Sequence, residues 1–134
     1  MKKSFAIILG VAAVLSLAIA ACKNSLTGNA PIVFPTSNVS YNKQVQPLFN
    51  DECAYPGCHD ANAAENGAIV SLTSYASTCN SVPGIVIKGN AKSSLLAQYV
   101  SNEYPQHIPV ISTILNQNQV QGIITWINEG ANNN

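Results

Sequence analysis

The chain has 134 residues, of which 47% are hydrophobic and 9% are charged, and its formal net charge at pH 7 is zero. This length allows one domain of ordinary size. The sequence contains no Arg and no basic run, so it lacks the positive patch typical of nucleic-acid-binding proteins, and we expect no nucleic-acid partner.

Residues 1–21 have the pattern of an export signal. Two lysines precede a small and apolar run over 5–19, which is too short for a permanent transmembrane helix. The small residues that end this run, directly before Cys22, resemble the lipobox of bacterial lipoproteins. The resemblance implies a lipoprotein signal peptide over 1–21, cleaved before Cys22, and lipidation of the Cys22 sulfur. The alternative is an ordinary secretory signal that happens to end at a cysteine.

A lipidated Cys22 would hold the protein in the bacterial cell envelope, because several acyl chains on one residue give a durable membrane anchor. Lys23 stands where an acidic residue would indicate retention in the inner membrane. We therefore expect the outer membrane, with the protein facing the periplasm or the cell surface. Residues 22–38 are rich in Asn, Ser, Thr, Gly and Pro, which predicts a flexible lipid-anchored tether. The folded domain is predicted over 39–134.

A short helix is expected at the start of this domain. Ser40 is a suitable N-cap, and apolar residues follow it at helical spacing. Pro47 lacks a backbone donor and clashes with the preceding turn, so the helix should start late or kink. It should end immediately before Cys53.

The stretch from Cys53 to His59 carries the strongest chemical signal. Cys53 and Cys58 are close together, and His59 follows the second cysteine directly. This arrangement is typical of c-type haem attachment, in which two thiols hold the porphyrin and the imidazole becomes an axial iron ligand. The gap is four residues instead of the usual two, and Pro56-Gly57 predicts a turn inside it. A disulfide among these cysteines and Cys79 is the main alternative, and a zinc site is a third.

The middle of the domain is predicted to be mostly irregular. Loops are expected at 60–67, 79–84 and 101–109. Cys79 is thus expected in a loop, and the β-branched run 85–87 forms at most a short strand. Asn90 is a suitable N-cap for a helix over 91–100.

The clearest predicted helix is the last one. Asn116 and Gln119 have the spacing of a capping box, and Gly130 is placed to end the helix. Between them, apolar residues recur at the i, i+3, i+4 and i+7 positions, namely Val120, Ile123, Ile124 and Ile127.

Several short sequence segments, in a fixed order, resemble those of a known protein family. They are residues 45–49, 53–60, 72–75, 88–96 and 123–131. Together, from about Val39 to Ala131, they resemble small single-haem cytochrome c domains of bacterial lipoproteins, some of which have four residues between the cysteines. The resemblance implies a mainly α, cytochrome c-like domain of about three to four short helices around one covalent haem c, with long loops. Cys53 and Cys58 would bind the haem covalently, and His59 would be an axial iron ligand.

The sixth iron ligand departs from the family pattern. Such domains usually supply a methionine from a Met-Pro pair in the loop before the last helix, and the corresponding residues here are Gln106-His107-Ile108-Pro109. Met1 is the only methionine and would leave with the signal peptide. We therefore expect His107 to be the sixth ligand, since a neutral imidazole binds iron well. The alternative is an exposed His107 beside an open or water-bound sixth site.

These features together predict a membrane-anchored c-type cytochrome that carries single electrons between exported redox partners. No catalytic residue set stands out, so we expect an electron-transfer protein and not an enzyme. Two other functions remain open. One is a haem enzyme or small-ligand sensor with an open sixth site, and the other is a haem-free binding lipoprotein stabilised by a disulfide.

Overall fold

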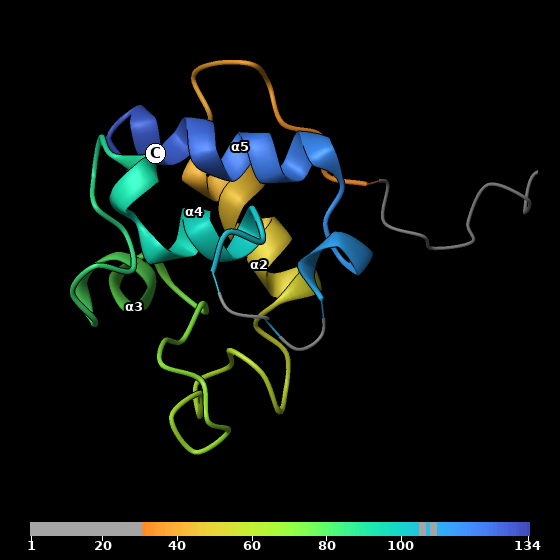
Figure 1. Ribbon diagram of the computed structural model, residues 1–134, viewed down its shortest axis with the longest axis vertical. Coiled ribbons are helices and arrows are strands. Elements are labelled where there is room, and N and C mark those ends of the chain that lie inside the picture. Colours follow the sequence, from red (N-terminus) through yellow and green to blue (C-terminus); the bar gives the residue numbers. More distant parts are fainter. Residues whose placement is uncertain (1–30, 105–106, 108–109) are drawn as a thin grey trace, which may run out of the picture. The chain divides into compact units, whose positions relative to one another are not determined.

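The computed structural model describes residues 31–104, 107 and 110–134. The predicted signal peptide, Cys22 and the first part of the predicted tether lie outside these residues. The described part of the chain contains four short α-helices and three single-turn helices, joined by turns and loops, and has no strand (Figure 1). In chain order they are η2 (Tyr41–Val45), α2 (Gln46–Glu52), α3 (Tyr75–Asn80), η3 (Ala91–Ser93), α4 (Leu95–Val100), η4 (Ile111–Thr113) and α5 (Gln117–Asn128). The prediction of a small, mainly α domain is confirmed. None of the described helices is long and apolar enough to cross a membrane.

The first helical segment starts as the sequence predicts. The Ser40 hydroxyl accepts a hydrogen bond from the Lys43 amide at 3.3 Å, and η2 leads directly into α2. Pro47 lies in the first turn of α2, directly after η2, and Pro is tolerated in the first turn of an α-helix. Leu48 and Phe49 are buried, and α2 ends just before Cys53, as expected.

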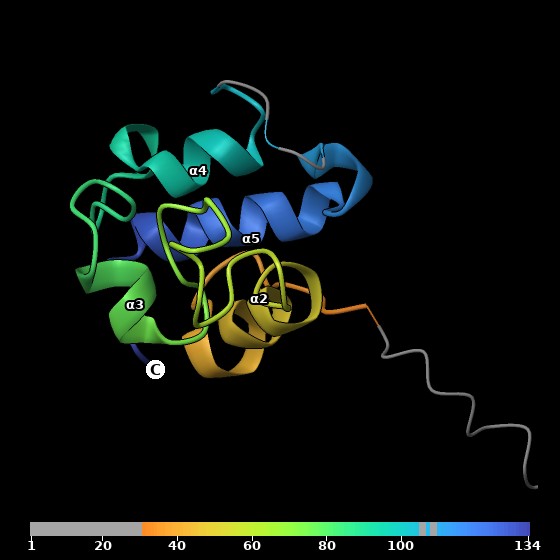
Figure 2. The ribbon, with the colours of Figure 1, turned by 90° about the horizontal axis from the view of Figure 1, so that it is seen from below.

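Helix α5 passes between α4 and the η2–α2 segment (Figure 2). Its capping box is present: the Asn116 side chain accepts from the Gln119 amide, and the Gln119 side chain accepts in return. Its apolar face is fully buried at Ile123, Trp126 and Ile127. Because three elements pack on α5, this helix forms the centre of the core.

Two predicted elements differ in the structure. Cys79 lies within α3 and not in a loop, because Ser74 and Ser77 form a capping box that starts a helix without an apolar stripe. The predicted helix over 91–100 is divided into η3 and α4. Ser94 separates them with an extended backbone (ψ 124°), and its buried hydroxyl donates to the carbonyl oxygen of Asn90 at 2.8 Å.

The segment before Val39 packs along α5. The Phe34 amide donates to Asn118 Oδ1 at 2.8 Å, and Asn118 Nδ2 donates to the Phe34 carbonyl oxygen at 3.0 Å. Phe34 is 3% exposed, and its ring occupies the space where a Cβ atom of residue 122 would lie. Gly122 is therefore required by close packing with Phe34 and not by backbone conformation.

A second pair of hydrogen bonds holds the other end of the same segment. The two oxygens of the Glu129 carboxylate accept from the amides of Asn38 and Val39 at 2.6 and 2.9 Å. Residues 31–38, part of the stretch expected to be a tether, are thus attached at two points, to Asn118 of α5 and to Glu129 directly after it. The remainder of that stretch lies outside the described residues.

Replacing Gly122 with Ala should destabilise the protein, because the new methyl group overlaps the Phe34 ring. In a Phe34→Gly background, which also removes the Phe34 Cβ that would lie 2.5 Å from the new methyl group, the same replacement should instead stabilise by up to about 1 kcal/mol, since Ala has the higher helix propensity. Phe34→Gly alone should cost at least about 3–5 kcal/mol, the usual loss when a buried Phe is truncated to Ala. Urea unfolding of the four proteins measures this cycle. Equal changes in the free energy of unfolding for Gly122→Ala in both backgrounds would contradict the close contact between residue 122 and Phe34.

Tyr41, a buried residue of this core, makes the stability of the fold depend on pH in the alkaline range. Its ring is 2% exposed, lies 5.5 Å from the Trp126 ring, and its hydroxyl donates to Gln46 Oε1. Burial raises the pKa of Tyr41 from 10.0 to about 12. The folded chain therefore holds the phenolic proton more tightly than the unfolded chain does. The contribution of Tyr41 to the free energy of unfolding is complete below pH 10 and is lost as the pH rises toward 12.

Replacing Tyr41 with Phe removes this titrating group while keeping the ring. We expect the variant to lose less stability than the parent between about pH 10 and 12, because Phe has no proton to release. Urea unfolding at about pH 8, 10 and 11.5 provides the measurement. Tyr104→Phe is the control, since Tyr104 is 48% exposed and should leave the pH profile unchanged. The same loss in the parent and in Tyr41→Phe would contradict the assignment.

Candidate functional site

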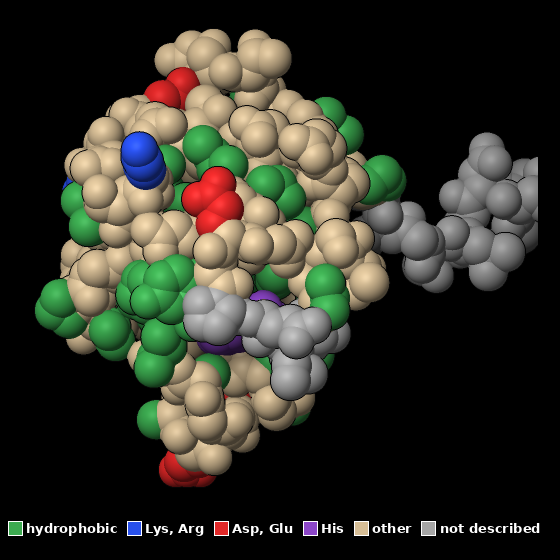
Figure 3. Space-filling view, in the orientation of Figure 1, with side chains coloured by type: hydrophobic (Ala, Val, Ile, Leu, Met, Phe, Trp, Pro, Cys, Tyr) green, Lys and Arg blue, Asp and Glu red, His purple; other side chains and the backbone are tan. Residues whose placement is uncertain are grey.

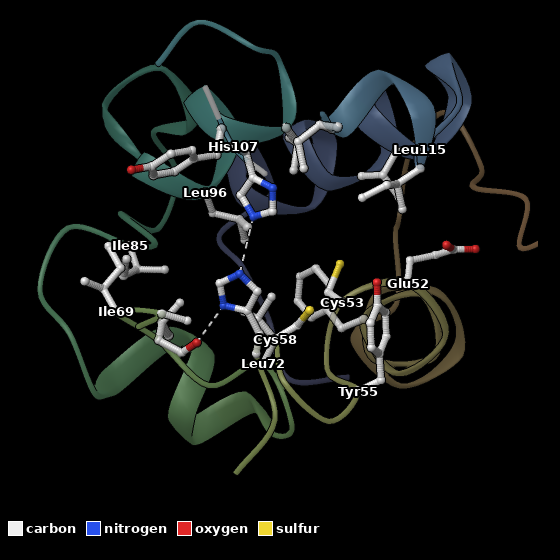
Figure 4. A pocket seen from close by; sticks show the side chains of 18 of the residues that line it. Glu52, Cys53, Tyr55, Cys58, Ile69, Leu72, Ile85, Leu96, His107 and Leu115 are labelled. Atoms are coloured by element: carbon white, nitrogen blue, oxygen red, sulfur yellow. Dashed lines mark hydrogen bonds between the residues drawn. The ribbon is translucent and has the colours of Figure 1, made fainter. Parts of the chain in front are cut away.

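A cavity of about 440 Å³ lies at the end of α2, between α4, α5 and the Cys53–His59 stretch. Figure 4 shows its side chains. Its volume lies within the range of small-molecule and cofactor sites. Most of the lining is apolar and includes Phe49, Val70, Leu72, Ile85, Leu96, Ile111, Leu115 and Ile123. Glu52 is the only acidic side chain among the described lining residues.

The backbone from Cys53 to His59 folds back on itself. The Cys58 amide donates to the Tyr55 carbonyl oxygen at 3.1 Å, and Gly57 has φ +90°, a conformation that glycine adopts readily. The His59 amide then donates to the Cys53 carbonyl oxygen at 3.1 Å. The four residues between the cysteines are therefore contained in a closed turn. Both sulfurs lie on the same side of the cavity (Figure 4).

His59 is oriented by the loop that follows it. Its Nδ1 lies 2.8 Å from the Val70 carbonyl oxygen, which can only accept, so Nδ1 carries the hydrogen. Nε2 of the neutral imidazole is then left with a lone pair that points into the cavity. A second bond, from the Leu72 amide to the His59 carbonyl oxygen at 2.9 Å, holds the same two segments together.

His107 lies opposite His59. The two Nε2 atoms are 3.4 Å apart, and the ring planes differ by 18° (Figure 4). Neither side chain is deeply buried, and histidine atoms are visible from outside beside a hydrophobic patch in the space-filling view (Figure 3). The structure thus brings together two residues that are 48 positions apart in the sequence and that were predicted as ligands of the same iron.

The three described cysteines are free thiols. Burial, with a smaller effect of Glu52, raises the pKa of Cys53 to about 12, so Cys53 is a neutral thiol at neutral pH and not an activated nucleophile. Cys79 is absent from the cavity lining, and burial raises its pKa to about 11, partly offset by Lys88. Cys53 and Cys58 therefore belong to the site, whereas Cys79 lies elsewhere.

Two contributors to the site were not found by sequence analysis. The Val70 carbonyl oxygen has no sequence signal, because any residue carries one. Tyr99 was predicted only to lie in the helix over 91–100, but its ring lines the cavity, 6.1 Å from the His107 ring and nearly perpendicular to it (75°). A tyrosine at the end of a helix, eight residues before a histidine, is too common a pattern to predict this contact.

Within the described part of the chain, no group of three or more His, Cys, Asp or Glu side chains is arranged to hold a metal ion. Comparison with protein-family models, with curated proteins and with solved structures found no match for this chain. The residues of the cavity are therefore the basis for inferring a function.

Proposed function

We propose that this protein is a c-type cytochrome that carries single electrons between redox partners of the bacterial cell envelope. One observation carries the proposal. Two imidazole Nε2 atoms face each other 3.4 Å apart in a largely apolar cavity whose wall also bears two cysteine sulfurs. Electron carriers of this class need two thiols on one side, an axial histidine beside them and a second ligand opposite.

Cys53 and Cys58 would attach the porphyrin. Each thiol would add across a vinyl group, with its sulfur bonding to one vinyl carbon and its hydrogen going to the other, so attachment would need no oxidant. The closed turn of 53–59 supports this role, because it compensates for the unusual gap by bringing both sulfurs to one side of the cavity. The bound group would supply an iron that changes its charge reversibly by one electron.

His59 and His107 would be the two axial ligands. The bond from His59 Nδ1 to the Val70 carbonyl oxygen orients the ring and increases the basicity of Nε2, as outer hydrogen bonds do for metal-bound histidines. An imidazole nitrogen binds transition metals at about 2.0–2.1 Å, so a separation of about 4 Å is needed across a metal. The observed 3.4 Å requires only a small outward shift of the rings.

Two imidazole ligands would leave no open coordination position on the iron. This favours electron transfer over ligand binding or catalysis. Replacing the usual methionine thioether with an imidazole should lower the reduction potential. A haem enzyme or small-ligand sensor with an open sixth site is the second candidate, and it requires that His107 not bind. The haem-free lipoprotein with a disulfide is the third. In the structure Cys53 and Cys58 are both free.

The proposed location follows from the sequence. Lipidation of Cys22 would anchor the protein, with the outer membrane favoured over the inner, and its partners would be other redox proteins. The acyl chains, and not a spanning helix of the described domain, would provide membrane attachment.

Absorption spectroscopy tests the proposal on the full chain, produced in a bacterial host that attaches haem c. We expect a Soret band that remains with the polypeptide after denaturation, and a low-spin spectrum that carbon monoxide changes only at concentrations high enough to displace an imidazole. Replacing Cys53 and Cys58 with Ser should abolish covalent attachment, because the thioether sulfurs are lost. Cys79→Ser is the matched control and should retain the haem.

Replacing His107 with Ala separates the remaining candidates. The variant should become high-spin and bind carbon monoxide, because it lacks the sixth ligand. A parent protein that is already high-spin would favour the open-site alternative. A colourless protein that folds cooperatively would overturn the cytochrome proposal.

A further inference from the structure

We infer that Tyr99, covered by Tyr104, is a positioning residue that holds His107 against the iron and so keeps the sixth position closed. The inference rests on the proposed function. It adds that the choice between electron transfer and ligand binding depends on an aromatic contact outside the set of iron ligands.

Tyr99 comes from a fixed part of the domain. It lies near the end of α4, whose Leu96, Ala97 and Val100 are buried. The Leu96 amide donates to the Ile85 carbonyl oxygen at 3.0 Å, which ties the helix to the chain before it. His107, in contrast, lies between α4 and η4 and belongs to neither. A side chain on a rigid helix can therefore define the position of a side chain outside it.

The rings of Tyr104, Tyr99 and His107 form a continuous series. Tyr99 meets His107 edge-on, with centroids 6.1 Å apart, and Tyr104 packs on Tyr99 with centroids 5.5 Å apart and planes at 59°. Both separations lie within the range of favourable aromatic pairs. Tyr104 is 48% exposed, so it covers Tyr99 from the solvent side. The His107 ring is thereby held between Tyr99 and His59.

The end of α4 explains why Tyr104 lies over Tyr99. Asn102 adopts the left-handed conformation (φ +56°), and its amide donates to the Tyr99 carbonyl oxygen at 3.1 Å. The Glu103 amide donates to the Gln98 carbonyl oxygen at 2.9 Å. These two bonds form a Schellman motif, which reverses the chain directly after the helix. Asn is one of the few residues that tolerate the required backbone angle.

Carbon monoxide affinity measures how firmly His107 is held, because carbon monoxide must displace the imidazole to reach the iron. Loss of one aromatic contact should raise the apparent affinity about fivefold. A general loss of stability should change this affinity equally in a variant outside the cavity, so comparison with such a variant distinguishes positioning from a purely structural role.

The test compares Tyr99→Leu, Tyr99→Phe and Tyr104→Leu in the haem-loaded full chain. We expect Tyr99→Leu to raise carbon monoxide affinity about fivefold and to increase the high-spin fraction, and Tyr104→Leu to do so more weakly. Tyr99→Phe keeps the ring and should behave as the parent. Tyr75→Leu is the control for destabilisation, because Tyr75 bonds to the Ala131 carbonyl oxygen outside the cavity and should leave the affinity unchanged.

The outcomes separate this inference from the function on which it rests. Covalent haem with unchanged affinity in Tyr99→Leu would overturn the role of Tyr99 and leave the cytochrome proposal standing. Equal increases in Tyr99→Leu and Tyr75→Leu would also overturn it, since destabilisation alone would then explain the effect. A parent protein without haem would overturn the proposed function itself.

Discussion

The hydrogen bond between His59 Nδ1 and the Val70 carbonyl oxygen determines what the cavity can do. It fixes the tautomer of the imidazole, so that Nε2 faces the cavity as a lone-pair donor. Without it the ring could turn, and a nitrogen carrying a hydrogen could face His107 instead. The Leu72 carbonyl oxygen, close to this bond, accepts from Gln46 Nε2 at 3.0 Å. Since Gln46 also accepts from the Tyr41 hydroxyl, a chain of hydrogen bonds connects the site to the aromatic core.

The same helix supports both the cavity and the packed N-terminal segment. Ile123 of α5 lines the cavity, and its neighbour Gly122 contacts Phe34, a residue that precedes the predicted domain start. Because α5 receives the segment on one face and the cavity on another, the packing of Phe34 contributes to the position of the cavity wall. In a domain of this size, where few side chains form the core, such shared support is expected.

The sequence predicts those features that depend on neighbouring residues. The capping box at Asn116 and Gln119, the N-cap at Ser40 and the end of α5 near Gly130 are all local effects, and all are confirmed. The break at Ser94 escaped prediction because it depends on where its hydroxyl group finds an acceptor. Helix α3 was missed because Ser74 and Ser77 start it without an apolar stripe. The contacts of Val70 and Tyr99 at the site depend on tertiary structure, which no local pattern encodes.

The two halves of the proposed iron site differ in how the chain holds them. Cys53, Cys58 and His59 lie in one closed turn, and backbone hydrogen bonds join that turn to α2 and to the following loop. His107 meets the site through its side chain, at the Nε2 atom of His59 and at the ring of Tyr99. A few substitutions near α4 could therefore open the sixth position without disturbing attachment of the haem. In the proposed cytochrome, the turn of residues 53–59 would determine that a haem binds, and the residues around His107 would determine whether the haem carries electrons or binds small ligands.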